Sequence, residues 1–496
     1  LATMNISAGA LTTDTVTADF DTSTTDLKMA FTGVEIFNAN VDSGDDGAET
    51  YSFDVSSATG LTTIELASGS ETDVADLNID EYSDSLTVQF GQSTAVGAGL
   101  GASSNVDINL ANSAGTTDTV NLKLQNTSDT GSIDVDAAGV EILNIALTTD
   151  DESHSLDLGG VAATSLSNTK INVTGGVAGD GLTISAIAST VNEIDASALV
   201  GTLTMTGSNT TAMTVTGGTA ADTIMMQHAS DVLNGGALTE GNTLDVNKAM
   251  VLGGIAVDLS STTDQVTTFN GAANSAAQTG FYHVDVSGVT GSFGADITAN
   301  AAGSTITGTT NVDVMTLGAG VDTINLNDAT VDAVSGFTVG TSKDVINIDI
   351  SEFSATFVEG DSSAVVASDT IDFEEITITG TATQTFAAGD NILFIDDNSY
   401  TATSVEALFV SGALIKAGAD EINWSIAPAD GEDMLLLYSD GTDAYLSVLN
   451  LDMDNGTATK LENTGTPTTT VTEIIKLEGI AHTDISSFVT GNFVLV

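Results

Sequence analysis

The stretch GTTNVDVMTLGAGVDTINL, residues 308–326, decides the fold. It holds two aspartates nine residues apart, Asp313 and Asp322, and each is followed two positions later by a large apolar residue, Met315 or Ile324. This phase is typical of a parallel β-roll, in which a strand of about three residues buries one apolar side chain and a turn of about six reverses the chain. About eighteen residues then complete one coil, so that equivalent turns of successive coils stack.

Short apolar blocks throughout the chain favour the same class of fold. The segments TVNLKL (119–124), LTMTG (203–207) and VINIDI (345–350) have strand length and are separated by Gly, Asn, Asp, Ser and Thr clusters. The pattern favours one short helix, within residues 404–418. The apolar content of 41% argues against disorder. The sequence therefore predicts an all-β, elongated, multi-module parallel β-solenoid or β-roll with β-sandwich-like repeats and few or no helices.

The charge balance excludes several classes of partner. The 496 residues include 68 acids, eight lysines and no arginine, which gives a formal charge of −60. Phosphate binding needs Lys and Arg, so nucleic acid is not expected as a partner, and an anionic lipid surface is excluded for the same reason. No apolar run approaches the roughly 20 residues that cross a bilayer, so membrane insertion is not expected either.

Repetition divides the first part of the chain. The segment FTGVEIFNANV (31–41) recurs as AAGVEILNIAL (137–147), and the shared G-V-E-I begins at Gly33 and again at Gly139. We therefore predict two homologous β modules, 1–106 and 107–212, followed by a roll region at 213–350 and a C-terminal β domain at 351–496. For the glutamate of this motif we expect a solvated strand position with a structural hydrogen bond.

The nine-residue phase also appears earlier in the predicted roll. In TGGTAADTIMMQHASDVLNGG (216–236), Asp222 follows two glycines and Asp231 comes nine residues later. Another acid, Glu240, lies eighteen residues after Asp222, although the turn there is longer than the repeat. A further unit of this kind ends at Asp344.

Stacked turns offer a reason for the repeated carboxylate. They can bring carboxylates and backbone carbonyls together as Ca²⁺ requires, with oxygens at about 2.3–2.6 Å. The alternative is that each aspartate caps its own turn through hydrogen bonds. The acidic loop of Asp42, Asp45, Asp46 and Glu49 is a further candidate, with a solvated loop as its alternative. The candidate calcium ligands are Asp222, Asp231, Glu240, Asp313, Asp322 and Asp344, with Gly218, Gly318 and Gly320 in the turns.

These segments resemble a known family. The G-G-x-x-x-D-x-U-x units look like degenerate RTX nonapeptides of type I secreted bacterial proteins, and the longer context resembles the calcium-dependent surface-layer proteins of Gram-negative bacteria. The resemblance extends to the hairpin-rich segment 434–449 and to the closing residues 474–496. It implies bound Ca²⁺, an extracellular position on the cell surface, an uncleaved C-terminal secretion signal, and a cell-surface polysaccharide as a possible anchor.

Other features of the sequence agree with export. The chain has no cysteine. It begins at Leu1 without a start methionine or signal peptide, so we expect a processed chain, a fragment, or export without an N-terminal signal. In the mechanism that the resemblance implies, low cytoplasmic calcium keeps the chain unfolded for export, and calcium outside the cell completes the rolls.

An enzyme is not expected. The four histidines, His154, His228, His283 and His482, are isolated, and neither H-E-x-x-H nor a G-x-S-x-G elbow is present. The leading prediction is a self-assembling surface-layer protein whose main partner is itself. The alternative is a secreted RTX adhesin or an extracellular filament or coat module. Thirty divalent cations would neutralise the sixty net charges, so most would be diffuse or would bridge subunits.

Overall fold

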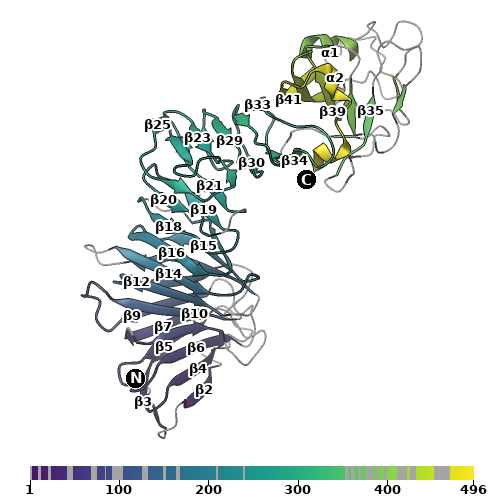
Figure 1. Ribbon diagram of the computed structural model, residues 1–496. Helices are drawn as coiled ribbons and strands as arrows, with labels where there is room; N and C mark the ends of the chain where they lie inside the picture. Colours follow the sequence, from purple (N-terminus) through teal and green to yellow (C-terminus); the bar gives the residue numbers. More distant parts are fainter. Residues whose placement is uncertain are drawn as a thin grey trace. The chain divides into compact units, whose positions relative to one another are not determined.

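In the computed structural model, the regular secondary structure of the described residues is almost all β, which confirms the predicted fold class (Figure 1). The chain divides into two compact units: unit 1 comprises residues 1–245 and 275–281, and unit 2 comprises residues 246–274 and 282–496. The structure describes residues 3–8, 13–20, 24–41, 49–68, 75–83, 85–91, 104–125, 132–148, 152–162, 168–207, 211–237, 241–351, 353, 357–358, 364–366, 369, 371–375, 384–386, 389, 391–395, 399–409, 422–424, 432–451 and 470–496.

Unit 1 is a parallel β-solenoid with two sheets, and successive strands alternate between them (Figure 1). The first sheet contains β1 (Thr3–Ser7), β3 (Thr24–Thr32), β5 (Glu49–Asp54), β7 (Ala75–Tyr82), β9 (Asn105–Leu110), β11 (Ile133–Ala138), β13 (Ser153–Ala162), β15 (Gly181–Ile187), β17 (Thr202–Met205), β19 (Thr223–Met226) and β21 (Thr243–Val246). The second contains β2 (Thr15–Phe20), β4 (Ile36–Val41), β6 (Thr63–Ser68), β8 (Thr87–Phe90), β10 (Thr119–Leu124), β12 (Ile142–Leu147), β14 (Thr169–Gly175), β16 (Val191–Leu199), β18 (Thr214–Thr216), β20 (Val232–Asn234) and β26 (Gln278–Thr279).

Alternating side chains build the core between these sheets. In β10, every second residue is buried, as the pattern TVNLKL predicts. Aromatic side chains fill the first coils, where Phe37 of β4 lies 5.7 Å from Phe53 of β5 between ring centroids. Contact across the two sheets explains why each coil needs a large apolar residue on both strands.

Coil length in unit 1 is irregular. Phe37, Ile64, Val88, Leu122 and Ile145 are successive register partners in the second sheet, separated by 27, 24, 34 and 23 residues. The G-V-E-I repeat therefore recurs four coils later along one continuous stack. The module boundary predicted at 106/107 falls inside β9, which pairs with both β7 and β11.

The G-V-E-I motif forms the same turn twice. Gly33 and Gly139 both adopt left-handed backbone, with φ of 68° and 83°, which favours glycine. Glu35 accepts a hydrogen bond from the backbone N–H of Asp14 at 2.7 Å, and Glu141 accepts one from Asp118 at 3.0 Å. The expected structural hydrogen bond is present, but Glu141 is only 4% exposed and is not a solvated side chain.

Unit 2 contains residues 246–274 and 282–350 of the predicted roll region, and the remainder of that region belongs to unit 1. One of the sheets of unit 2 is formed by β27 (His283–Asp285), β30 (Thr305–Thr307), β32 (Thr323–Leu326), β34 (Val345–Ile348) and β42 (Phe493–Leu495). The other is formed by β25 (Ala272–Ala273), β24 (Val266–Phe269), β23 (Ile255–Asp258), β29 (Ala295–Thr298), β31 (Val314–Thr316), β33 (Asp332–Ser335), β41 (Thr470–Glu478), β40 (Ala444–Leu451), β39 (Glu432–Ser439), β37 (Ile392–Phe394) and β35 (Phe373–Glu375). Two short pairs are added, β22 (Ala249–Met250) with β28 (Thr290–Gly291) and β36 (Gln384–Phe386) with β38 (Ile422–Trp424).

The eighteen-residue coil is confirmed where the nine-residue phase is regular. Ile297 pairs with Met315, and Ile306 pairs with Ile324, each eighteen residues later. The next coils are longer, because Ile324 pairs with Ile346 after twenty-two residues. The phase in the sequence thus predicts the register correctly until turns of unequal length interrupt it.

The C-terminal segment returns to the roll of unit 2. The strands β39 and β40 form the predicted antiparallel hairpin, β41 pairs in parallel with β33, and β42 pairs in parallel with β34. The helix α1 (Ala402–Phe409) overlaps the start of the segment predicted as helical, whose residues 410–418 lie outside the described residues. The closing residues add α2 (His482–Ile485) and a 3₁₀ turn, η2 (Thr490–Asn492). No helix among the described residues is long and apolar enough to cross a membrane.

Candidate functional site

The aspartates of the nine-residue phase are buried in the turns, each directly ahead of a strand. Asp313 precedes β31 and Asp322 precedes β32, and both side chains are 0% exposed. The same holds for Asp222 ahead of β19 and Asp344 ahead of β34, while Asp231 ahead of β20 is 3% exposed. Each carboxylate therefore lies inside the solenoid wall and not on its surface.

Asp313 shows what these carboxylates contact. Its Oδ1 accepts the backbone N–H of Ala295, eighteen residues earlier, at 2.6 Å. Its Oδ2 accepts the N–H of Thr309 in its own turn at 2.7 Å, and the Thr309 hydroxyl donates to Oδ1 at 2.8 Å. The N–H of Asp313 then donates to Oδ1 of Asp332 in the following coil at 2.8 Å. One residue thus links three successive turns, two through its side chain and the third through its backbone N–H.

The same arrangement recurs around Asp322. Its Oδ1 accepts the N–H of Ser304 at 2.7 Å and its Oδ2 accepts the N–H of Gly318 at 2.9 Å. Its own N–H donates to Oδ1 of Asp344 at 2.8 Å, and Asp344 in turn accepts the N–H of Thr338 at 2.7 Å. We call this repeated arrangement the turn ladder. Its members are Asp222, Asp231 and Asn242 in unit 1, and Asp313, Asp322, Asp332 and Asp344 in unit 2.

In unit 1, Asp222 bonds Leu203 and Gly218 in the same way, at 2.7 and 2.6 Å. The next member is Asn242, whose Oδ1 accepts the N–H of Asp222 at 2.9 Å. Glu240, the acid predicted at this place, lies outside the described residues. The turn is two residues longer than the repeat, which places Asn242 in the position ahead of the strand.

Asp231 makes both bonds of the turn ladder, one to the coil before it and one within its own turn. Its Oδ1 accepts the N–H of Met213, and its Oδ2 accepts the N–H groups of Gln227 and His228 at 2.9 and 2.8 Å. The acidic loop of Asp42, Asp45 and Asp46 lies outside the described residues, as does the side chain of Glu49.

Burial dominates the electrostatics of the turn ladder. It raises the pKa values of the Asp222, Asp313 and Asp322 carboxyls, and hydrogen bonds from backbone N–H groups partly oppose this increase. Burial raises the pKa of Asp332 to about 8, and the nearby Asp313 and Asp328 carboxylates add to the increase. A buried carboxylate with such neighbours is stabilised by a proton or by a cation.

The predicted calcium ligands are not gathered into a cage. Among the described residues, no three His, Asp or Glu side chains lie close enough to share a metal ion. Ca²⁺ takes six to eight oxygens, whereas each ladder carboxylate lies in its own turn and accepts backbone N–H groups. The described side chains alone therefore do not form an internal calcium site, and calcium binding remains a prediction.

Carboxylates also line the outer face of the first sheet in unit 1. Asp107 pairs in register with Asp136, and Asp134 pairs with Asp157. Partial burial and these neighbours raise the pKa values of the Asp107 and Asp134 carboxyls. Because adjacent strands lie about 4.8 Å apart, the rows concentrate negative charge on one face. We call these four residues the acidic rows.

The three glycines predicted as metal ligands have a packing role. None has positive φ. A Cβ atom on Gly318 would lie 2.4 Å from the carbonyl oxygen of Asn300, one on Gly320 would lie 2.3 Å from Ala302, and one on Gly218 would lie 2.6 Å from the Leu199 oxygen. The close stacking of consecutive turns requires glycine here, and not a left-handed backbone.

Gly318→Ala is expected to destabilise unit 2 by about 1–3 kcal/mol, because the backbone of the neighbouring turn must move away from the new Cβ atom. The measurement is urea unfolding followed by circular dichroism. Gly491→Ala is the matched control, since a Cβ atom there meets nothing within 4 Å. Equal midpoints for the two variants would contradict the packing role.

The described histidines have structural surroundings. His283 Nδ1 accepts the backbone N–H of Thr305 at 2.8 Å, and burial lowers its pKa. His154 is 1% exposed in β13. The backbone N–H of His228 is one of the donors to Asp231.

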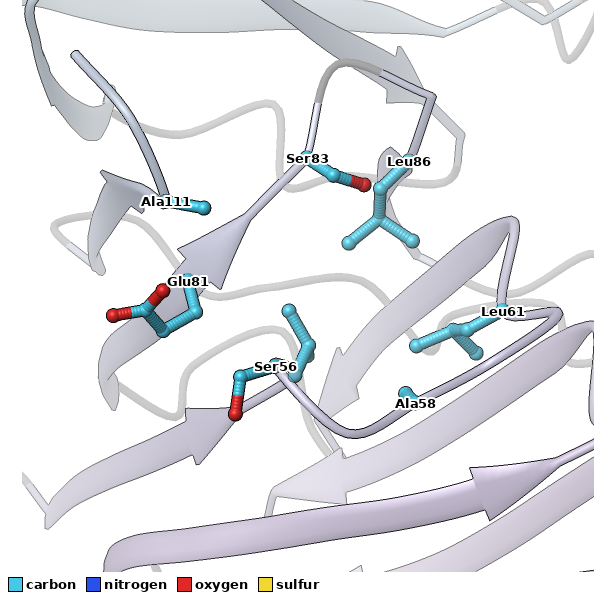
Figure 2. A pocket seen from close by; sticks show the side chains of 8 residues that line it. Ser56, Ala58, Leu61, Glu81, Ser83, Leu86 and Ala111 are labelled. Carbon is cyan, nitrogen blue, oxygen red and sulfur yellow. The ribbon is translucent and has the colours of Figure 1, made fainter.

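A shallow hollow of about 280 Å³ lies among the turns of unit 1 that follow β5, β7 and β9 (Figure 2). Ser56, Glu81, Ser83 and Leu86 are among the side chains that line it. Glu81 has left-handed backbone with φ of 61°, which is uncommon for a residue with a side chain. The lining holds a single carboxylate and no aromatic ring, so it defines no substrate class.

In comparisons with known proteins, no family model, curated protein or solved structure matches the chain.

Proposed function

We propose that this protein is a structural, self-assembling surface-layer protein, exported by a Gram-negative bacterium and ordered on the cell surface by calcium. The observation that carries the proposal is a solenoid that stacks carboxylates coil upon coil, in the turn ladder and in the acidic rows, within a chain of net charge −60. The resemblance of its turns to RTX repeats supports calcium as the cation.

The charge makes the cation a condition of assembly. Like charges on two approaching copies repel within a Debye length of about 8–10 Å. The acidic rows hold Asp107 beside Asp136 in register, so divalent cations are expected to condense there or to bridge between copies. Eight lysines cannot neutralise 68 acids from within the chain. Calcium would therefore act mainly on surfaces between copies.

The fold supports a scaffolding role. Unit 1 and the roll of unit 2 consist of coils whose inner residues form the core, and turns in both repeat one hydrogen-bonding arrangement. Each coil contacts only its neighbours, which lets such a scaffold present the same face many times. A lattice subunit needs a rigid repeated surface of this kind.

Electron microscopy of the purified protein in millimolar calcium is the first test. Ordered sheets or filaments are expected, and they should dissolve when a chelator is added, because the acidic surfaces then repel. Circular dichroism on the same samples reports whether the chain stays folded. A solution with sodium chloride at matched ionic strength is the control for simple screening.

The opposite result is equally clear. Particles that remain monomeric in both conditions, with an unchanged β signal, would remove calcium-dependent assembly from the account. An adhesin or coat module would then be the better proposal.

A further inference from the structure

One set of turns in unit 2 carries exposed apolar side chains. Leu252 is 78% exposed, Val251 70%, Val312 59% and Phe293 40%. They lie in the turns that lead into β23, β29 and β31, ahead of three neighbouring strands of one sheet. We call these four residues the apolar turn ridge. Contiguous exposed apolar residues of this size are uncommon on a monomer and mark interaction surfaces.

Close stacking of the backbone aligns the ridge. A Cβ atom on Gly254 would lie 2.0 Å from the Gly294 oxygen, and one on Gly294 would lie 1.9 Å from the Val312 oxygen. The Asn311 side chain donates to the Phe293 carbonyl at 3.4 Å, which ties two of the turns together. The exposed side chains therefore follow one another from coil to coil on a rigid support.

The turns of the ridge also carry no charged side chain. Residues 249–254, 286–294 and 308–312, which form these turns, contain no Asp, Glu or Lys. Residues 249–312 as a whole contain four acids in 64 residues, about half the density of 68 in 496. Two copies of a chain with charge −60 repel least where such a surface meets its equivalent.

We propose that the apolar turn ridge is a contact between two copies of this chain, formed by the same patch on both in a two-fold pair. A cationic partner would be attracted to the acidic rows instead, and a lipid surface would favour Lys or Arg beside the apolar residues, which these turns lack. The inference deepens the proposed self-assembly and rests on it for its biological role.

Sedimentation velocity in millimolar calcium tests the contact. The double variant Leu252→Asp/Val312→Asp places two charges on the ridge. It is expected to raise the apparent Kd of self-association at least tenfold, because each substitution removes an apolar side chain that the contact would bury. The control is Val314→Asp/Val321→Asp, which makes the same charge change at valines that are 50% and 51% exposed outside the ridge. Its Kd should stay within about twofold of wild type.

A fluorescent label separates this contact from lattice formation. The chain has no cysteine, so Leu252→Cys carries a single pyrene, and ridge-to-ridge pairing should give excimer emission that Val321→Cys does not give. If lattices form without excimer emission, and the ridge variant forms them as well as wild type does, the inference is overturned and the proposed function stands. Excimer without lattices would support the ridge contact and contradict the surface layer. A monomer without excimer would contradict both.

Discussion

Asp313→Ala is expected to destabilise unit 2 by about 3–5 kcal/mol. The substitution leaves the backbone N–H groups of Ala295 and Thr309 without the acceptor that each has in the native fold, and it leaves the Thr309 hydroxyl with the Asn311 carbonyl alone, at 3.3 Å. Thr309 and Asp313 are 0% exposed and Ala295 is 4% exposed, so water does not replace the carboxylate without a rearrangement. A buried donor without a partner costs about 1–3 kcal/mol. Urea unfolding by circular dichroism measures the loss.

Asp296→Ala is the matched control for this prediction. Asp296 lies on the exposed face of β29, beside Ala295, and its removal makes the same change of charge. We expect a difference within about 0.5 kcal/mol of wild type, as for most surface substitutions. If Asp313→Ala were no less stable than Asp296→Ala, the turn ladder would not be a stabilising device. A loss that appears only when calcium is present would instead identify Asp313 as a calcium ligand.

The regular part of the roll could be predicted from the sequence because two signals coincide there. Met315 and Ile324 mark buried strand positions, and Asp313 and Asp322 mark the turn before each strand. The eighteen-residue register follows from this phase. Where a turn is longer, the phase no longer shows which residue stands ahead of the next strand.

Asp332 and Asn242 were missed for that reason. Counting eighteen residues from Asp313 leads to Val331, and from Asp222 to Glu240, whereas the ladder bonds reach nineteen and twenty residues ahead. A signal independent of counting was available. In Asp332-Ala-Val and Asn242-Thr-Leu, a short polar acceptor stands at the start of an alternating strand or directly ahead of it. That local pattern identifies turn ladder members whatever the turn length.

The chemistry of the carboxylates could not be predicted from spacing. Both readings of the repeated aspartate, calcium ligand and turn cap, place it at the same position of the turn. The structure shows which groups the carboxylate oxygens contact. In Asp322 they accept the N–H groups of Ser304 and Gly318. The register of unit 1 was harder to predict, because coils that vary from 23 to 34 residues give the sequence no constant period.

The stability of the roll is expected to fall as pH rises from about 5 to 8 in the presence of a chelator. Burial and the neighbouring Asp313 and Asp328 carboxylates raise the pKa of Asp332 from 3.8 to about 8, so the folded state holds a proton that the unfolded chain releases near pH 4. The stabilisation is complete below the unfolded pKa and is lost as pH rises through the folded one. One such group contributes up to about 1.4 kcal/mol per pH unit, or on the order of 4 kcal/mol over the three units from pH 5 to 8.

Hydrogen exchange of the Asp313 amide measures this loss locally, because that N–H donates to Asp332 Oδ1 and exchanges when the turn opens. Carboxyls whose pKa values are lowered, such as those of Asp54 and Asp195, titrate below pH 3.8 and do not change the stability between pH 5 and 8. Asp332→Asn keeps an acceptor for the Asp313 amide but removes the titrating carboxyl. In this variant, hydrogen exchange of the Asp313 amide should lose most of the pH dependence that comes from opening of the turn. An unchanged dependence in this variant would contradict the assignment to Asp332. If calcium abolished the dependence in the wild type but not in Asp313→Ala, the cation would be replacing the proton within the turn ladder itself.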